Sequence, residues 1–351
     1  MAKVLNIYFA THKSCNLDCS YCYVPKYNKN NRREDDQKIL TALDKFFDTV
    51  ENEKRKIGIF CLHGSEPSLV SPETLGKIIN RVNRHWAEND ITGKTVAIQS
   101  NGLRFTSDYL DTVEKEIGDL KKIRLGFSID FPKSAHDKYR NNSFDKVYAN
   151  YDTARKRGMK VSILSVVTRE TMNCLDEFAD GISRELELYR KAGNPYKVKI
   201  KLATGEMALT DDETERFGQF LIKKNLAGLM QILTPGYCLQ SGNECLWYEF
   251  DVDGKVYACN KTYNKAGIFA DWHKESFGKI EKKRATLFAD TIEHPDCGKC
   301  EYEFFCNSGC PTDRIKTGPD AGKAHECRII KAVMSDLQKR NIHLQIFYNN
   351  N

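Results

Sequence analysis

The chain lacks any run of about 18 apolar residues, the length that a membrane-spanning helix requires. Its first eleven residues hold one lysine and an apolar stretch that polar residues end too soon for a secretion signal. No block of Lys and Arg with interleaved aromatic residues stands out, so nucleic-acid binding is not predicted. These absences predict a cytoplasmic protein with neither a membrane nor a nucleic acid among its partners.

The length, composition and cysteine content indicate the number of domains and the use of the cysteines. The 351 residues, 40% hydrophobic and 29% charged, suffice for one large α/β domain and a smaller one. The net charge of +6 is mild. Thirteen cysteines in a chain expected to be cytoplasmic indicate metal binding rather than disulfides.

Three of these cysteines form a C-x3-C-x2-C run, Cys15, Cys19 and Cys22, just after the apolar residues 4–10. Three thiolates on one loop can hold three irons of a four-iron cluster and leave the fourth iron open to a small molecule, as in a catalytic metal site. Two other interpretations are half a zinc site, with His12 as the nearest additional ligand, and three unrelated thiols.

The spacing, with Tyr21 directly before the third cysteine, resembles the signature of the radical S-adenosylmethionine (SAM) enzymes. In that family the open iron chelates the amino and carboxylate groups of SAM. Reductive cleavage of SAM then gives methionine and a 5'-deoxyadenosyl radical, which abstracts hydrogen from the substrate. The resemblance therefore implies an iron–sulfur cluster and SAM as cofactors, with Tyr21 beside them.

Up to residue 225 the sequence alternates β-rich runs with amphipathic segments. The predicted strands are 4–10, 57–62, 95–99, 123–129, 161–167 and 198–202. The predicted helices begin at Ser71, with Pro72 at the first helical position, or span 143–157, 174–191 and 211–224. Six strand–helix units predict an α/β fold, a partial (β/α)6 barrel over residues 1–225, which matches the radical SAM fold. Chemistry in such barrels lies at the C-terminal ends of the strands.

The second strand ends in Gly64-Ser65-Glu66-Pro67. This resembles the Gly-Gly-Glu-Pro motif whose backbone grips the SAM amino group in the family. Ser65 replaces the second glycine, and we expect it to be tolerated if its φ is negative. The alternative interpretation is an ordinary strand-to-loop turn.

Further polar residues follow the next two strands. By resemblance, Gln99 and Ser128 face SAM, and Arg140 meets its carboxylate in a bidentate pair. A surface ion pair is the alternative for Arg140. Asp130 ends the fourth strand and is a candidate for touching SAM or substrate and for removing a proton.

The region 226–351 has a different character. It is rich in Cys, Gly and aromatic residues, and up to residue 327 we expect metal rather than a long periodic helix to hold it together. A last helix over 327–340 and a strand over 342–348 are predicted. The cysteine spacing resembles the SPASM domain of radical SAM enzymes that modify peptides and proteins. By resemblance, two auxiliary four-iron clusters take Cys238, Cys245, Cys259 and Cys310, and Cys297, Cys300, Cys306 and Cys327.

Eight thiolates would close both clusters, leaving structural support and electron transfer as roles; a pair of structural zinc ions is the alternative. The two remaining cysteines, Cys61 and Cys174, are expected to be small buried apolar residues.

The residue after Cys259 bears on the reaction. Anaerobic sulfatase-maturating enzymes carry an Asp there as the base of formylglycine formation, whereas this chain has Asn260, whose amide cannot accept a proton. The predicted activity is therefore oxidative crosslinking (C–C, C–O or C–S) of a ribosomally made peptide. The alternatives are a sulfatase-maturase-like activity, a dehydrogenase or epimerase, and a non-catalytic electron carrier.

The expected partners follow from that activity. They are a peptide with a leader and an electron donor such as flavodoxin or ferredoxin. Because the first strand begins at residue 4, no leader-recognition domain is expected in the chain, and a separate protein is the candidate for that role.

Overall fold

The structure of the chain is a computed structural model. It describes residues 4–24, 34–192, 197–230, 233, 245, 247–262, 267–289, 294–310, 312 and 326–340. The expected ligand Cys238 and the expected strand over 342–348 lie outside the described residues.

Six parallel strands form the part of the sheet that the sequence predicted, in the order β6-β5-β4-β3-β2-β1. They are β1 (Val4–Ala10), β2 (Lys56–Leu62), β3 (Val96–Ser100), β4 (Ile123–Ser128), β5 (Lys160–Val167) and β6 (Lys197–Leu202). Because consecutive strands are neighbours and every connection crosses over outside the sheet, the chain winds into the expected partial barrel. This prediction is confirmed.

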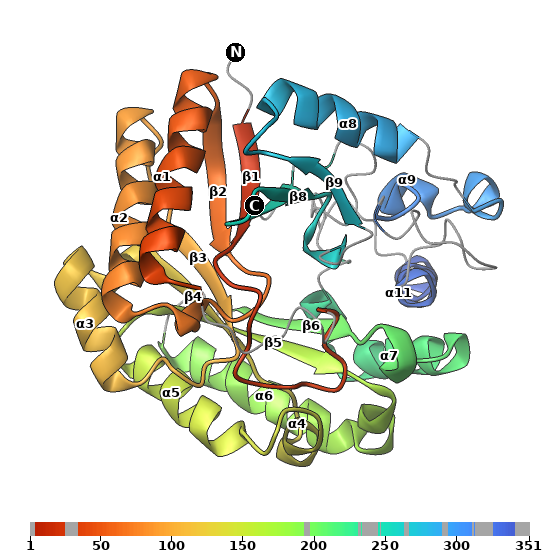
Figure 1. Cartoon of the computed structure of the whole chain (residues 1–351). Helices are drawn as coiled ribbons and strands as arrows, with labels where there is room; N and C mark the ends of the chain where they lie inside the picture. The colour runs from red at the N-terminus through yellow and green to blue at the C-terminus, as the bar shows by residue number, and fades with distance from the viewer. Residues whose placement is uncertain are drawn as a thin grey trace.

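Helices cover the outer face of the barrel sheet (Figure 1). They are α1 (Asp36–Asn52), α2 (Pro72–Glu88), α3 (Ser107–Ile117), α4 (Lys133–Tyr139), α5 (Phe144–Lys156), α6 (Leu175–Ala192) and α7 (Asp211–Lys223). The predicted start of α2 is confirmed, since the Ser71 side chain accepts from the Thr74 N–H at 3.2 Å. Gly158, in the left-handed region at φ 73°, follows the end of α5 as expected.

The core lies between the sheet and these helices. Phe46 and Phe47 of α1, for example, are fully buried against the rings of Phe9 and Phe60. Each such side chain contributes about 1.5–3 kcal/mol to stability through removal of its apolar surface from water. The side chains on the barrel side of the strands are more polar, and they form the site.

The sheet continues beyond residue 225. β7 (Trp247–Asp251) runs parallel to β1, with Trp247 opposite Asn6, and the antiparallel strands β8 (Lys255–Tyr257) and β9 (Ile268–Asp271) bring the sheet to nine strands within the described residues. The sequence did not predict β7, because Glu249 and Asp251 interrupt its apolar pattern. The predicted domain boundary at residue 225 stays a prediction. The strands on its two sides are nevertheless hydrogen-bonded into one sheet.

The expectation of no long helix between 226 and 327 is wrong. α8 (Phe277–Ala289) lies there and buries Phe277, Ile280 and Phe288 along one face. Arg284 occupies the same buried face, with its guanidinium carbon 3.8 Å from the centre of the Tyr248 ring and a hydrogen bond to the Trp247 carbonyl. Because Arg284 interrupts the apolar stripe, the helical periodicity of this segment is not evident from the sequence.

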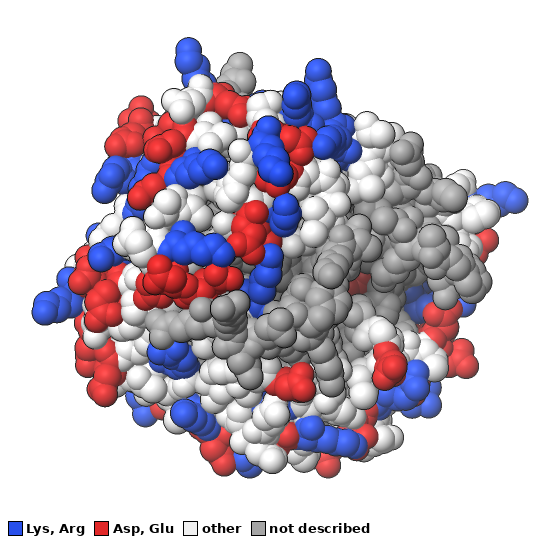
Figure 2. Space-filling view, viewed as in Figure 1, with Lys and Arg blue, Asp and Glu red and all other residues white. Residues whose placement is uncertain are grey.

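Two further helices of the described residues lie on this side of the molecule. The short α9 (Glu303–Cys306) lies near α11 (Cys327–Lys339), and α11 packs against α7 (Figure 1). None of the helices in the described ranges is long and apolar enough to cross a membrane. On the face shown in Figure 2, acidic and basic side chains are interspersed.

Candidate functional site

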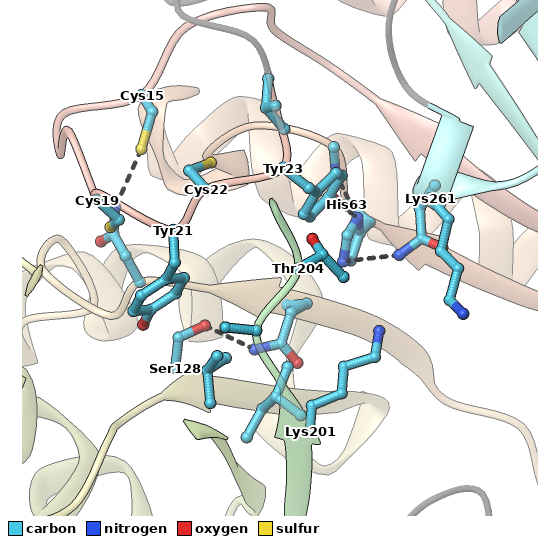
Figure 3. A pocket seen from close by; sticks show the side chains of 18 of the residues that line it. Cys15, Cys19, Tyr21, Cys22, Tyr23, His63, Ser128, Lys201, Thr204 and Lys261 are labelled. Atoms are coloured by element: carbon cyan, nitrogen blue, oxygen red, sulfur yellow. Dashed lines mark hydrogen bonds between the residues drawn. The ribbon is translucent and has the colours of Figure 1, made fainter. Parts of the chain in front are cut away.

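A cavity of about 470 Å³ opens where the barrel strands end. Its wall combines the three-cysteine loop, the ends of β2 to β6, and Asn260, Lys261, Thr312 and Glu326 from the C-terminal region. Figure 3 shows the loop on one side and the β6 residue Lys201 on the other. The site is therefore at the C-terminal ends of the strands, as predicted.

The loop after β1 is tied to the ends of two other strands. The Asn101 amide donates to Cys15 Sγ at 3.6 Å and to Asn16 Oδ1 at 2.8 Å. The Glu66 N–H donates to the Ser14 carbonyl at 3.2 Å. Burial, then the charge of Glu66, raises the pKa of the Cys15 thiol to about 12, so iron binding would have to displace this proton.

All three loop cysteines, Cys15, Cys19 and Cys22, line the cavity. No group of three His, Cys, Asp or Glu side chains in the described part of the chain is arranged to hold a single metal ion. A four-iron cluster makes a different demand, because each thiolate binds its own iron. The donor set fits such a cluster, with three thiols facing one cavity.

The turn after β2 has little space for side chains. Gly64 has φ 110°, and a Cβ there would lie 2.7 Å from Glu249 Oε1 and 2.8 Å from Ala10 Cβ, so only glycine fits. Ser65 is not among the residues with positive φ, which meets the condition set for its replacement of glycine. Its hydroxyl is buried with no hydrogen-bond partner among the described residues.

Glu66 fastens the ends of β2 and β3 together. Its carboxylate accepts from the Ser68 N–H at 2.9 Å, the Ser100 hydroxyl at 2.7 Å and the Asn101 N–H at 2.8 Å. These bonds account for both oxygens of a side chain that is 1% exposed. Its predicted contact with the cofactor stays a prediction, and its visible role is to hold the wall of the cavity.

Gln99 and Ser128, which the sequence predicted to face SAM, lie next to each other in the structure, and their contact with SAM stays a prediction. The Gln99 amide donates to the Ser128 hydroxyl at 3.0 Å, and both residues line the cavity from the ends of β3 and β4. An amide and a hydroxyl at this position suit hydrogen bonds to a polar ligand.

Asp130 lies behind the cavity wall. Its carboxylate accepts from the Tyr21 hydroxyl and, at 2.8 Å, from the Val166 N–H, and it is not among the lining residues. Burial raises its pKa, opposed chiefly by Arg140. The geometry therefore favours Asp130 as a support for Tyr21 over its predicted role as a base towards substrate.

Arg140 is 5% exposed and lines the cavity, which excludes the alternative of a surface ion pair. Its Nη1 donates to the Tyr21 oxygen at 2.7 Å. Its Nε is buried without a partner in the described part of the chain. Together with the Ser65 hydroxyl, this gives the thiol end of the cavity two unpartnered buried polar groups, which fits a ligand with amino and carboxylate groups such as SAM.

The other end of the cavity holds residues to which the sequence assigned no role. They are Tyr23, His63, Lys201 and Lys261. The Tyr23 hydroxyl lies 3.1 Å from His63 Nδ1, and Asn260 Nδ2 lies 3.5 Å from His63 Nε2. Burial, then Lys201, lowers the pKa of His63 to about 3, so its ring is neutral at physiological pH. Strand alternation was the available signal, since Lys201 lies on the barrel side of β6 and His63 directly follows the last residue of β2.

Four of the C-terminal cysteines lie near one another, and the predicted cluster ligand sets stay a prediction. Burial, followed by Cys327, Cys297 and Cys300, raises the pKa of the Cys306 thiol to about 12, so these four thiols are neighbours. The pKa of Cys245 is raised by burial and then by Cys310.

Cys259 adjoins Asn260 at the edge of the cavity. Burial, then Glu249, Cys22 and Cys259, raises the pKa of the Tyr23 phenol, so the thiols of Cys22 and Cys259 both lie near that ring.

The two leftover cysteines differ. Cys61 is buried at 8% exposure, as expected. Cys174 is partly exposed just before α6, and its thiol donates to the carbonyls of Glu170 and Thr171 at 3.7 and 3.6 Å. The expectation of burial is wrong for Cys174, because it caps the short helical turn Arg169–Asn173 and contacts carbonyls that the C-terminal end of this turn leaves unpaired.

Comparison with known proteins gives one family. A sequence model of the Radical SAM superfamily matches residues 11–182. A Cysteine-type anaerobic sulfatase-maturating enzyme of Clostridium novyi is 25% identical over 336 residues, 88% of this chain and 87% of the relative. A Serine-type anaerobic sulfatase-maturating enzyme of Bacteroides thetaiotaomicron is 24% identical over 351 residues, 87% of this chain and 82% of the relative.

Solved structures agree on the fold. Native anSMEcpe with bound AdoMet and the Kp18Cys peptide matches with a TM-score of 0.73 and 18% identity, covering 98% of this chain and 99% of that one. Streptococcus suis SuiB bound to precursor peptide SuiA matches with a TM-score of 0.61 and 12% identity, covering 93% and 76%. With the three-cysteine loop, the strand-end residues and the partial barrel in place, the chain belongs to the radical SAM superfamily.

Proposed function

We propose that the enzyme oxidises a side chain of a peptide or protein substrate at the cavity between the three-cysteine loop and Asn260. One observation carries the proposal: a single cavity contains both the residues that fit SAM, such as Ser65 and Arg140, and a separate polar end around His63 and Asn260. The second end leaves room for a substrate beside the cofactor. Curated relatives that span most of the chain are sulfatase-maturating enzymes, which supports a protein substrate.

Different residues of the chain would bind the cluster, bind SAM and orient the Arg140 guanidinium. Cys15, Cys19 and Cys22 would hold the cluster, and Ser65 and Arg140 would bind the polar groups of SAM. When bound, the cluster and SAM supply a 5'-deoxyadenosyl radical that removes a hydrogen atom from the substrate. Tyr21, held between Arg140 and Asp130, keeps the guanidinium oriented towards the cavity.

We further propose that the remaining ligand set holds two closed auxiliary clusters. Cys297, Cys300, Cys306 and Cys327 would hold one, and the neighbourhood of these thiols supports that set. Cys238, Cys245, Cys259 and Cys310 would hold the other. The nearness of Cys259 to the Tyr23 ring would place the second cluster close to the cavity, where it can serve a substrate that loses a second electron.

Two oxidations remain as candidates. The curated relatives favour formylglycine formation on a Cys or Ser side chain, and the crosslinking that the sequence predicted has less support. Asn260 argues against formylglycine, because its amide cannot remove the proton that this reaction releases. His63, whose Nδ1 accepts from the Gly64 N–H at 2.7 Å, presents Nε2–H rather than a free lone pair to the cavity and does not replace that base.

Mass spectrometry separates these candidates. The reconstituted enzyme, SAM and a reductant are incubated with sulfatase-derived peptides carrying Cys or Ser, and with short peptides encoded beside the gene. We expect a neighbouring peptide to lose two hydrogens per event while the sulfatase peptides stay unmodified. Formylglycine on either sulfatase peptide would instead establish the maturase activity, and a product of unchanged mass would support epimerisation.

A further inference from the structure

We propose that the groove between α7 and α11 binds the part of the substrate peptide that lies outside the cavity, and that this part of the peptide is acidic. The inference rests on the proposed function and names the class of its substrate. It follows from where the two helices begin, from how their packing leaves a groove, and from the charges that line the groove.

Both helices begin beside the cavity, and they lie next to each other (Figure 1). Glu326, which directly precedes α11, lines the cavity, and so does Gly205, which comes shortly before the start of α7 at Asp211. Arg328 Nε and Asp211 Oδ2 are 3.0 Å apart and join the first turns of the two helices. A peptide whose oxidised residue occupies the cavity can therefore continue along α7 and α11.

Small residues at the contact between the helices leave a groove along them. A Cβ added at Gly218 of α7 would lie 3.2 Å from Ala332 Cβ and 3.5 Å from Ile329 Cα of α11. The space beside this contact has a volume of about 730 Å³ and is lined by both helices and by Tyr302. Each helix has 13 residues and so spans about 20 Å, a length that an extended peptide covers with about six residues.

Basic residues outnumber acidic ones in the lining of the groove. The basic residues are Lys223, Arg328, Lys331, Lys339 and Arg340, and the acidic ones are Glu215 and Asp336. Arg328 is paired with Asp211, and Arg340 is paired with Asp336 at 2.9 Å. The pKa of Asp176 is lowered first by Lys224 and then by Lys223, so the charge of Lys223 is also partly compensated. Two lysines of the lining remain.

Lys331 and Lys339 are these two residues. Neither forms an ion pair with any residue that the structure describes. Both line the groove from α11, about 12 Å apart along the helix axis. Two carboxylates that are about four residues apart in an extended peptide match this spacing. A charge-assisted hydrogen bond at each lysine would hold such a peptide along the groove.

Other occupants of the groove match these charges less well. Residues 341–351, which follow α11, contain no Asp or Glu. A second copy of the chain carries the same net charge of +6 and would be repelled. A nucleic acid would find no aromatic side chain on which to stack, because Tyr302 is 6% exposed and its hydroxyl donates to Gln338 Oε1 at 2.9 Å. An acidic peptide is the occupant that the two lysines favour.

The test uses fluorescein-labelled peptides with one Cys and, beginning about five residues from it, two Glu that are about four residues apart. Twin peptides have Gln at both positions, and each pair is made with the Glu residues before or after the Cys. Binding to the full-length, cluster- and SAM-loaded enzyme is measured by fluorescence anisotropy. At low salt we expect one Glu peptide to bind about fivefold more tightly than its Gln twin, a preference that added salt weakens. Equal binding within both pairs, or no binding, overturns the proposal.

Charge reversal locates the effect. Lys331→Glu combined with Lys339→Glu should abolish the preference for Glu. The control combines Lys77→Glu of α2 with Lys146→Glu of α5, two exposed lysines outside the groove, so that both variants have the same net charge. A preference that survives in the groove variant, or that is lost equally in the control, contradicts the assignment. A flavodoxin or single-stranded DNA that binds the wild type more tightly than the Glu peptide, and only while Lys331 and Lys339 are intact, would overturn it as well.

The proposed function and the groove proposal fail separately. The proposed function fails if the enzyme cleaves SAM yet oxidises no peptide or protein, whichever peptides bind. The groove proposal fails on the binding comparison alone. Release of 5'-deoxyadenosine without substrate should be the same in both variants as in the wild type, because none of the four lysines lines the cavity. If the groove variant releases less, the milder change Lys331→Gln with Lys339→Gln repeats the comparison, and a preference for Glu that it retains overturns the proposal.

Discussion

Arg140 donates a hydrogen bond to the phenol oxygen of Tyr21 at 2.7 Å, and both side chains belong to the wall of the cavity. The Tyr21 hydroxyl in turn donates to the buried Asp130. These two hydrogen bonds fix the Arg140 guanidinium. They leave its Nε without a partner among the described residues. A SAM carboxylate is the partner that the account expects.

Arg140→Ala should therefore weaken SAM binding by about 1–3 kcal/mol, the loss of a charge-assisted hydrogen bond. Equilibrium dialysis with SAM measures this. Arg157→Ala is the control, because Arg157 does not line the cavity and instead pairs with the exposed Asp111 and Glu114 of α3. Unchanged affinity in the Arg140 variant would mean that this residue serves the substrate or the fold instead.

Gly64→Ala should impair both folding and SAM binding. Its φ of 110° is unfavourable for alanine, and the added Cβ would meet Glu249 and Ala10 within 2.8 Å. Gly118→Ala is the matched control, with φ 80° and nothing within 4 Å of the added Cβ. We expect about 1–2 kcal/mol of destabilisation in the control, the cost of placing alanine in the left-handed region, and more in the Gly64 variant, read from thermal unfolding. Equal losses would show that contact at Gly64 is unimportant.

Glu249→Gln tests a buried carboxyl group. Glu249 is 0% exposed with no hydrogen-bond partner for either oxygen in the described ranges, and burial, then Asp251, raises its pKa well above the usual 4.5. The folded state therefore holds this proton more tightly than the unfolded state, so the wild type loses stability as pH rises above about 4.5. The Gln variant lacks that loss.

The advantage of Glu249→Gln in free energy of unfolding should consequently grow between about pH 5 and about pH 8. Urea unfolding at both pH values measures it. Glu88→Gln, at an exposed position of α2, should show no such growth. A constant difference for the Glu249 variant would mean that this carboxyl group is ionised in the folded protein.

Iron analysis tests the cluster assignments. The anaerobically reconstituted chain should hold roughly 12 irons with similar sulfide, from three four-iron clusters. Replacing Cys15, Cys19 and Cys22 with Ala should remove about a third, and replacing Cys297, Cys300, Cys306 and Cys327 should remove another third. Only four irons in the fully loaded wild type, or zinc in their place, would contradict the three-cluster assignment.

The sequence predicted most of the barrel because its signals are local. Apolar runs gave the six strands to within a residue or two, and the Ser71–Pro72 pair marked the start of α2. It missed β7 and α8, where Glu249 and Arg284 are buried residues with ionisable side chains that break the apolar pattern and depend on tertiary contacts.

The residues of the site were likewise predicted where the signal is local and missed where it depends on the fold. The cysteines, Gly64 and Arg140 belong to spaced motifs and were found. Lys201 and Lys261 were missed because each is a single residue whose meaning comes from a neighbour far along the chain. Asp130 was found, but only the structure shows that Tyr21 separates its carboxylate from the cavity.

SAM cleavage by the iron-loaded protein depends on the three thiols of the loop after β1. The iron-loaded wild type, given SAM and a strong reductant, should release 5'-deoxyadenosine and methionine in equal amounts, measured by liquid chromatography and mass spectrometry. The variant with Ala at Cys15, Cys19 and Cys22 should release neither while retaining the irons bound by the C-terminal cysteines. No cleavage by the iron-loaded wild type, or equal cleavage by the variant, would contradict the assignment of this cavity as a radical SAM site.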